Sequence, residues 1–137
     1  MSDAHVLYCD GASRGNPGPA SIGAVIFDPE GETVVEISGA IGEATNNVAE
    51  YQALIAGLEA ARDRDLDPLV VRLDSLLLVK QVTGEYRVKA AGLKPLARRA
   101  VRLLASFEDV EVEHVRRERN TVADALANRA LDEEDDS

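Results

Sequence analysis

The hydrophobic pattern of the chain changes its period near residue 46, and this change limits the fold more than any other feature of the sequence. Before it, short apolar or alternating segments predict three β-strands, at residues 4–10, 21–27 and 33–41. After it, apolar residues recur at helical spacing from Asn46 or Asn47 to about Arg62. Residues 28–31 favour a tight hairpin turn, and the glycine- and proline-rich residues 11–19 predict a longer turn. We therefore expect an antiparallel meander followed by a helix.

The rest of the chain alternates between predicted strands and helices. Its apolar pattern predicts a strand at 69–74, helices at 75–82 and 93–104, a strand at 109–115, and a helix at 121–131 capped by Asn120. A meander followed by such units predicts an α/β fold with a mixed sheet and helices packed on it. We expect one domain over residues 1–131 and a disordered acidic tail over residues 132–137.

The composition excludes several classes of protein. Of the 137 residues, 45% are hydrophobic, which is enough for a core and too many for a disordered chain. No apolar run approaches the ~20 residues that would span a bilayer, and the first residues lack the pattern of a signal peptide. Cys9 is the single cysteine, so no internal disulfide can form. We expect a monomeric cytoplasmic protein without a membrane segment.

Charge is unevenly distributed along the chain. The net charge of −10 argues against binding to nucleic acid, because an acidic surface repels phosphates. However, seven basic residues and one acidic residue lie between Lys80 and Arg102, and Arg116, Arg117 and Arg119 form a second basic group. These basic segments are either ordinary solvated faces or surfaces that contact phosphates.

Four acidic residues stand in apolar surroundings, unlike most of the other acids: Asp10, Glu50, Asp74 and Asp124. Asp10 and Asp74 each follow an apolar strand. Glu50 lies within the first predicted helix, and Asp124 lies near the start of the last one. Taken singly, each has an ordinary explanation as a turn residue, a helix cap or a first-turn acid.

Taken together, the four carboxylates indicate a metal site. Ionised carboxylates near apolar surface are costly and repel one another, and a divalent cation removes this conflict. Mg²⁺ prefers oxygen ligands. Two such ions ~4 Å apart can activate a water and stabilise the leaving oxygen of a phosphodiester. We therefore expect the four acids to meet and to bind two Mg²⁺ ions, with Mn²⁺ as the alternative.

Four segments around these acids resemble the signature blocks of the type 1 ribonuclease H family, in the family's order and spacing. They are YCDGASRGNPGPASIGAV, ATNNVAEYQALIAGLEAA, LDSLLLVKQVTGEYRVK and HVRRERNTVADALANRAL. The resemblance implies a five-stranded mixed sheet whose first three strands are antiparallel. It also implies two-metal-ion hydrolysis of the RNA strand of RNA–DNA hybrids, which leaves 5′-phosphate and 3′-hydroxyl ends. The catalytic metal ligands would be Asp10, Glu50, Asp74 and Asp124.

Other positions match residues that touch the nucleic acid in this family. They are Asn16, Thr45, Asn46 and Asn47, to which we add Gly11 and Ser75 beside two of the acids. Short amides suit the 2′-hydroxyls and base edges of a shallow minor groove. Backbone amides of the predicted turn from Gly11 to Gly15 could approach a phosphate. Helix capping is the alternative role of Asn46 and Asn47.

The chain departs from the family pattern at three places. It has no Trp and lacks the basic protrusion of some members, so we expect the DNA strand to be held by Lys89, Lys94, Arg98 and Arg99. Leu76 stands where many members have Gln. Arg117 lies near the position of a mobile His in some members, and we expect it to steer phosphate or help product leave, because arginine stays protonated.

Two other functions remain open at the level of the sequence. A nuclease of the same fold that cuts DNA would need no 2′-hydroxyl, and a non-cleaving module would bind RNA or hybrids without metal-dependent cutting. The presence of all four acids argues against the non-cleaving module, and activity on an all-DNA duplex would favour the DNA nuclease.

Overall fold

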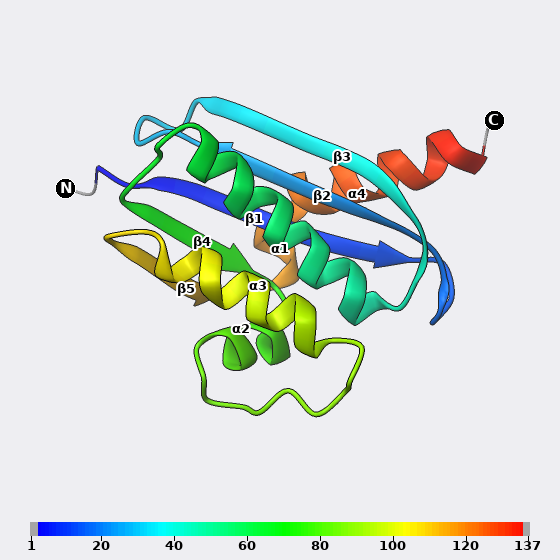
Figure 1. The fold of residues 1–137 in the computed structure, drawn as a ribbon. Helices are drawn as coiled ribbons and strands as arrows, with labels where there is room; N and C mark the ends of the chain where they lie inside the picture. Colours follow the sequence, from blue (N-terminus) through cyan, green and yellow to red (C-terminus); the bar gives the residue numbers. More distant parts are fainter. Residues whose placement is uncertain (1–2, 136–137) are drawn as a thin grey trace.

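A five-stranded sheet in the order β3-β2-β1-β4-β5 forms the centre of the molecule (Figure 1). This computed structural model describes residues 3–135. The strands are β1 (His5–Ser13), β2 (Gly18–Phe27), β3 (Thr33–Ala44), β4 (Leu69–Leu73) and β5 (Val110–His114). The first three pair antiparallel, and β4 pairs parallel with both β1 and β5. The predicted mixed sheet with an antiparallel first half is confirmed.

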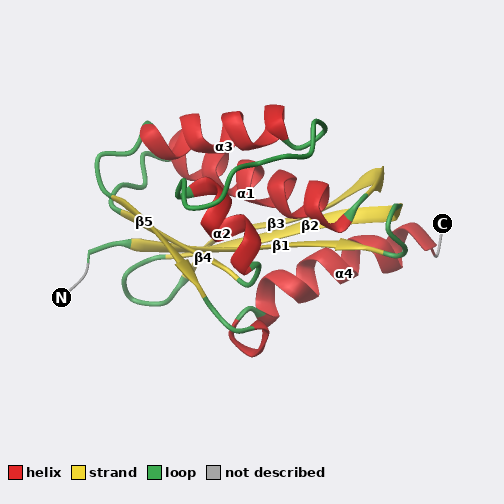
Figure 2. Cartoon of the chain, turned by 90° about the horizontal axis from the view of Figure 1, so that it is seen from below, coloured by secondary structure: helices red, strands yellow, loops and turns green. Residues whose placement is uncertain are grey.

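The helices lie in two layers, one on each face of the sheet (Figure 2). They are α1 (Asn46–Asp63), α2 (Leu76–Val82), α3 (Lys94–Ala105) and α4 (Thr121–Asp135), with a 3₁₀ helix at Arg117–Arg119. α1 and α3 pack together on one face, whereas α4 packs on β1, β2 and β3 from the other face. The middle strand of the sheet, β1, is therefore covered by helices on both faces.

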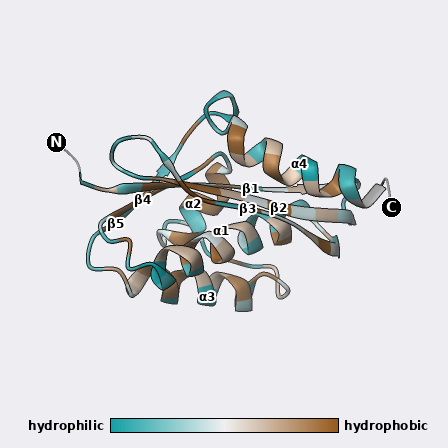
Figure 3. Cartoon of the chain, turned by 90° about the horizontal axis from the view of Figure 1, so that it is seen from above, coloured by the Kyte–Doolittle hydropathy of each residue, from teal (hydrophilic) through white to brown (hydrophobic). Residues whose placement is uncertain are grey.

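The main core fills the space between the sheet and α1. Leu7 and Val71 from the sheet and Leu54 and Leu58 from α1 are fully buried there, and α3 adds Ala100. Hydrophilic and hydrophobic residues alternate along α3 and α4 (Figure 3), as expected for helices with one face on the protein. No helix within residues 3–135 has the length and apolar character required to cross a membrane.

The first hairpin is longer than the sequence predicts. β1 continues to Ser13 and β2 begins at Gly18, so the turn spans residues 14–17 rather than 11–19. Ser13 still pairs with Ala20 across the hairpin. Pairing between the strands therefore outweighs the turn preference of the glycines and prolines, and Gly11 is a strand residue.

Two helix ends also differ from the prediction. Thr45 caps α1, because its hydroxyl accepts a hydrogen bond from the Val48 N–H at 3.2 Å, and Asn46 and Asn47 lie in the first turn. The tail that we expect to be disordered from residue 132 begins as part of α4, which extends to Asp135. Ion pairs of Arg129 with Glu133 and of Arg14 with Asp132 stabilise this extension. Residues 136–137 lie outside the described part of the chain.

Candidate metal centre

The site lies where β4 ends beside β1. The ladder between these strands ends at the pair Cys9–Leu73, whereas β1 continues to Ser13. Beyond this point no strand among residues 3–135 covers this edge of β1, so side chains from both faces of the sheet can meet there. Asp10 is the first residue of β1 past the ladder, and Asp74 is the first residue after β4.

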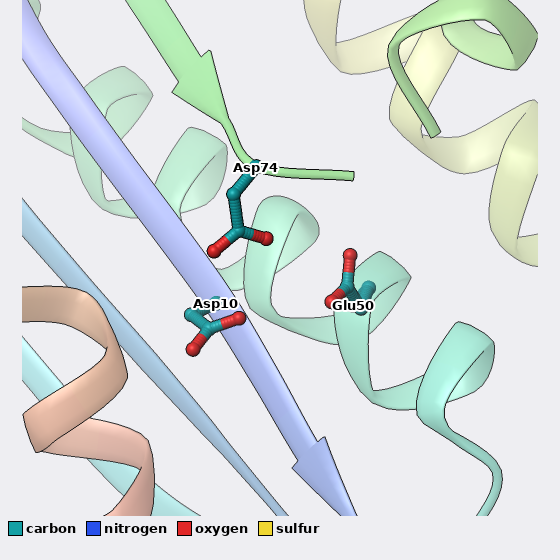
Figure 4. Close-up of side chains that lie close together, drawn as sticks. All are labelled: Asp10, Glu50 and Asp74. Atoms are coloured by element: carbon teal, nitrogen blue, oxygen red, sulfur yellow. The ribbon is translucent and has the colours of Figure 1, made fainter. Parts of the chain in front are cut away.

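Three of the four predicted carboxylates converge at this edge. Asp10 comes from β1, Glu50 from α1 and Asp74 from the end of β4, and one carboxylate oxygen of each lies within 4.8 Å of the other two. Figure 4 shows the three side chains pointing toward one another. Acids separated by dozens of positions in the sequence are therefore neighbours in the fold, as predicted.

Two glycines allow the helices that carry the other acids to approach the sheet beside Asp10. A Cβ atom at Gly11 would lie 2.4 Å from the backbone nitrogen of Glu50, so the absent side chain leaves room for α1. Gly23 of β2 pairs with Asp10, and a Cβ there would lie 2.2 Å from the carbonyl oxygen of Ala123 in α4. Asp124 follows Ala123 directly, and its carboxyl shares a hydrogen bond with that of Asp10. It thus adjoins the group of three.

The proximity of these groups changes their acidity. Burial, then the negative charge of Asp74 and the hydrogen bond with Asp124, raise the pKa of the Asp10 carboxyl to about 8. Burial and the charge of Asp74 raise the pKa of Glu50 to about 7, although a hydrogen bond from Ser75 and the positive charge of Arg117 act in the opposite direction. Negative charge is therefore unfavourable at this site without a compensating cation.

The donor set fits a divalent metal ion. Carboxylate oxygens are the ligands preferred by hard divalent cations, and a cation among Asp10, Glu50 and Asp74 would cancel both the mutual repulsion and the cost of burial. Arg117 lies near enough to Glu50 to lower its pKa, but it is exposed in the 3₁₀ helix. The site therefore combines a partly buried acidic centre with one exposed arginine beside it.

The predicted nucleic-acid contacts fall into two groups. Near the start of α1, the exposed Asn16 accepts a hydrogen bond from the backbone N–H of Asn46 at 3.2 Å, and Thr45 caps the helix beside them. Asn47 lies on a surface groove together with Lys89. The structure therefore brings the polar residues of the first hairpin and of α1 together.

The remaining basic candidates lie farther along the surface. Lys94 and Arg98 line a neighbouring groove beside α3, and Arg99 is engaged in an ion pair with Glu59 at 2.6 Å. Lys89, Lys94 and Arg98 are all exposed.

Two predicted contact residues have other partners in the structure. Gly11 is buried in β1 against the backbone of α1, so the expected approach of its amide to a phosphate in an open turn is wrong. Ser75 caps α2 by accepting a hydrogen bond from the Leu78 N–H at 3.2 Å, and it also hydrogen-bonds to Glu50.

Asn120 is a site residue whose position the sequence did not predict. We expected its side chain to cap α4, but the side chain is 1% exposed and donates hydrogen bonds to the Cys9 carbonyl and to Asp74 Oδ2. Its Oδ1 has no hydrogen-bond partner among the described residues. An unpaired buried polar atom costs about 1–3 kcal/mol. Nothing in the local sequence distinguishes this Asn from an ordinary cap.

Known proteins resemble the chain over most of its length. A sequence model of a family described as reverse transcriptase-like matches residues 8–130. A relative from Halobacterium salinarum named ribonuclease HI is 51% identical over 126 residues, which are 92% of this chain and 63% of that relative. The chain therefore spans less than two thirds of the length of this curated relative.

Solved structures agree with the observed fold. A crystal structure of RNase H1 from Halobacterium salinarum has a TM-score of 0.92 and 49% identity, and the match covers 95% of this chain and 98% of that one. A structure of LC11-RNase H1, isolated from compost by a metagenomic approach, in complex with an RNA/DNA hybrid has a TM-score of 0.88 and 42% identity, over 94% of this chain and 97% of that one.

Proposed function

The chain belongs to the type 1 ribonuclease H family, and we propose that it hydrolyses the RNA strand of RNA–DNA hybrids at the acidic centre described above. The observation that carries the proposal is the convergence of Asp10, Glu50 and Asp74, whose oxygens lie within 4.8 Å of one another. Asp124, which contacts Asp10, completes the proposed set of ligands. A related structure that holds an RNA/DNA hybrid supports the choice of substrate.

We assign the metal as Mg²⁺, with Mn²⁺ as a substitute. Two divalent ions held by these carboxylates would supply a nucleophilic water and stabilise the leaving 3′-oxygen, which yields 5′-phosphate and 3′-hydroxyl ends. The protein's own part is to hold Asp10, Glu50 and Asp74 close together at the open edge of β1. In this proposal the acids act as metal ligands rather than as a general acid and base.

The substrate would lie across the centre and contact two groups of side chains. Asn16, Asn46 and Asn47 present exposed amides beside the start of α1, where they could bind 2′-hydroxyls and base edges of the minor groove. Lys89, on the same groove as Asn47, and Lys94 and Arg98 farther along offer exposed positive charge for phosphates of the DNA strand.

Arg117 has a separate proposed role. Its guanidinium lies within electrostatic reach of Glu50 and stays protonated at neutral pH, so it would attract a phosphate to the centre rather than transfer a proton.

One cleavage experiment tests the proposed function. The same labelled RNA is offered as a hybrid, as a single strand and as double-stranded RNA, each with Mg²⁺ and with a chelator, and an all-DNA duplex is included. We expect cleavage of the hybrid alone and only with Mg²⁺. Cleavage of the DNA duplex would instead indicate a DNA nuclease, and tight hybrid binding without cleavage would indicate a binding module.

A further inference from the structure

One residue, Asn120, connects three of the segments that carry the acids. Its amide nitrogen donates to the carbonyl of Cys9, the residue before Asp10, at 2.9 Å. The same nitrogen donates to Oδ2 of Asp74 at 3.0 Å. Its backbone carbonyl accepts a hydrogen bond from the N–H of Asp124 at 3.1 Å. A single residue therefore contacts β1, the end of β4 and the first turn of α4 at the metal centre.

The hydrogen-bond partners fix the orientation of the Asn120 amide. The Cys9 carbonyl and the Asp74 carboxylate both accept hydrogen bonds, so the side chain must present its NH₂ group to them and uses both of its hydrogens. The opposite oxygen is then left buried without a partner among residues 3–135. The unpaired buried oxygen lowers the stability of the folded protein. A buried polar group that keeps this cost is typical of a residue with a functional role rather than a packing role.

The contact with Asp74 also fixes the rotation of that carboxylate. A carboxylate has two oxygens, and one held by a buried donor leaves the other free to bind a cation. Asp74 is half-buried and follows the last residue of β4, so the strand ladder does not fix its side chain. The Asn120 amide, at 3.0 Å, is the buried donor that holds Asp74 Oδ2.

We infer that Asn120 is a positioning residue, which orients the Asp74 carboxylate and holds the segments of Asp10, Asp74 and Asp124 at the spacing that the metal ions require. This inference rests on the proposed function, because it assigns Asn120 a role toward the same divalent ions. In this role Asn120 would bind the ligand carboxylate rather than the substrate or the metal. Its effect on catalysis would pass entirely through the geometry of the carboxylates.

Binding of Mn²⁺ alone, measured by titration calorimetry, tests the inference without relying on cleavage. Asn120→Ala removes both hydrogen bonds, and we expect it to weaken Mn²⁺ binding by about tenfold to a hundredfold, as loss of an orienting partner does at other metal sites. The kcat on hybrid substrate at a fixed Mn²⁺ concentration should fall by a similar factor, with KM changed less than about threefold. Asn120→Asp keeps the size of the side chain but replaces the donor with an acceptor, and we expect at least the same loss.

Ser21→Ala is the matched control. Ser21 is fully buried, and its hydroxyl donates to the carbonyl of Ala127 at 2.6 Å, so it anchors the same helix, α4, to the sheet through β2. We expect Ser21→Ala to lower the melting temperature and to leave Mn²⁺ affinity unchanged. If it weakened Mn²⁺ binding as much as Asn120→Ala, the role of Asn120 would be only structural.

The two proposals fail in different ways. A wild-type protein that neither binds Mn²⁺ nor cleaves hybrid overturns the proposed function. A wild-type protein that does both, beside an Asn120→Ala variant with unchanged Mn²⁺ affinity, overturns the positioning role alone. If neither Asn120 variant folds, the NMR signals of the Asn120 side-chain NH₂ group in the wild-type protein are followed during a Mg²⁺ titration. They should shift with the midpoint of metal binding, and signals that do not move would contradict the inference.

Discussion

Gly11 and Ala49 approach each other so closely that no methyl group fits between them. A Cβ atom at Gly11 would lie 2.3 Å from the carbonyl carbon of Ala49. Gly11 follows Asp10 in β1, and Ala49 precedes Glu50 in α1. The contact between these two small residues therefore determines how near the two acids come to each other, and it links the packing of the fold to the geometry of the metal centre.

Gly11→Ala should consequently destabilise the protein and impair the site. The added methyl group must displace the backbone of α1, so we expect a loss of about 3 kcal/mol or more in the free energy of unfolding, measured with urea. Gly39→Ala in β3 is the control, because a Cβ there would have no atom within 4 Å. If both variants were equally stable, the close approach of β1 and α1 would not contribute to the stability of the protein.

Asp74→Asn should remove activity and preserve the fold. Asparagine keeps the size of the side chain and an oxygen that can still accept the hydrogen bond from Asn120, whereas the negative charge is lost. We expect cleavage of labelled hybrid to fall by more than about 1,000-fold, because metal ions contribute several kcal/mol to such reactions. Glu36→Gln removes an exposed acid of β3 and should cleave normally. Turnover of Asp74→Asn close to that of the wild type would exclude Asp74 from the site.

Without metal ions, the stability of the protein should fall as the pH rises from about 4 to about 8. The pKa values of Asp10 and Glu50 are raised from 3.8 and 4.5 to about 8 and about 7 in the folded state. Over this range the unfolded chain loses protons that the folded protein retains. The stabilising contribution of the two carboxyls is therefore fully present below their unfolded pKa values and is lost as the pH rises through their folded pKa values. Thermal unfolding in the presence of a chelator measures this change.

Mg²⁺ should reverse this loss. A bound cation favours the ionised carboxylates, so we expect Mg²⁺ to raise the melting temperature more at a pH of about 8 than at a pH of about 5. In Asp10→Asn, which lacks one of the two shifted carboxyls, the metal-free melting temperature should depend less on pH. An equal effect of Mg²⁺ at both pH values in the wild type would contradict the coupling between protons and metal.

The sequence predicts the fold and the site correctly where the local periodicity agrees with the contacts made in the folded protein. The alternation before residue 46 predicted the meander, and the apolar surroundings of Asp10 and Asp74 marked them as unusual acids. The prediction that Gly11 lies in a turn is wrong. The local composition favours a turn there, and the hairpin is extended by the pairing of Ser13 with Ala20, which the composition does not reveal. Asn120 was missed as a partner of Asp74, since the two are 46 positions apart and an Asn before a helix is an ordinary cap.

Removing positive charge beside the proposed substrate path should reduce the salt dependence of binding. Lys89 is exposed on the groove that also contains Asn47, and it is proposed to contact one phosphate. In a cleavage-deficient Asp74→Asn background, Lys89→Ala should weaken hybrid binding and reduce the slope of log K against log salt by about 1, measured by fluorescence anisotropy. Arg129→Ala removes a charge from α4 on the opposite face of the sheet and should leave the slope unchanged. A slope altered by Arg129→Ala but not by Lys89→Ala would place the nucleic acid on the α4 face.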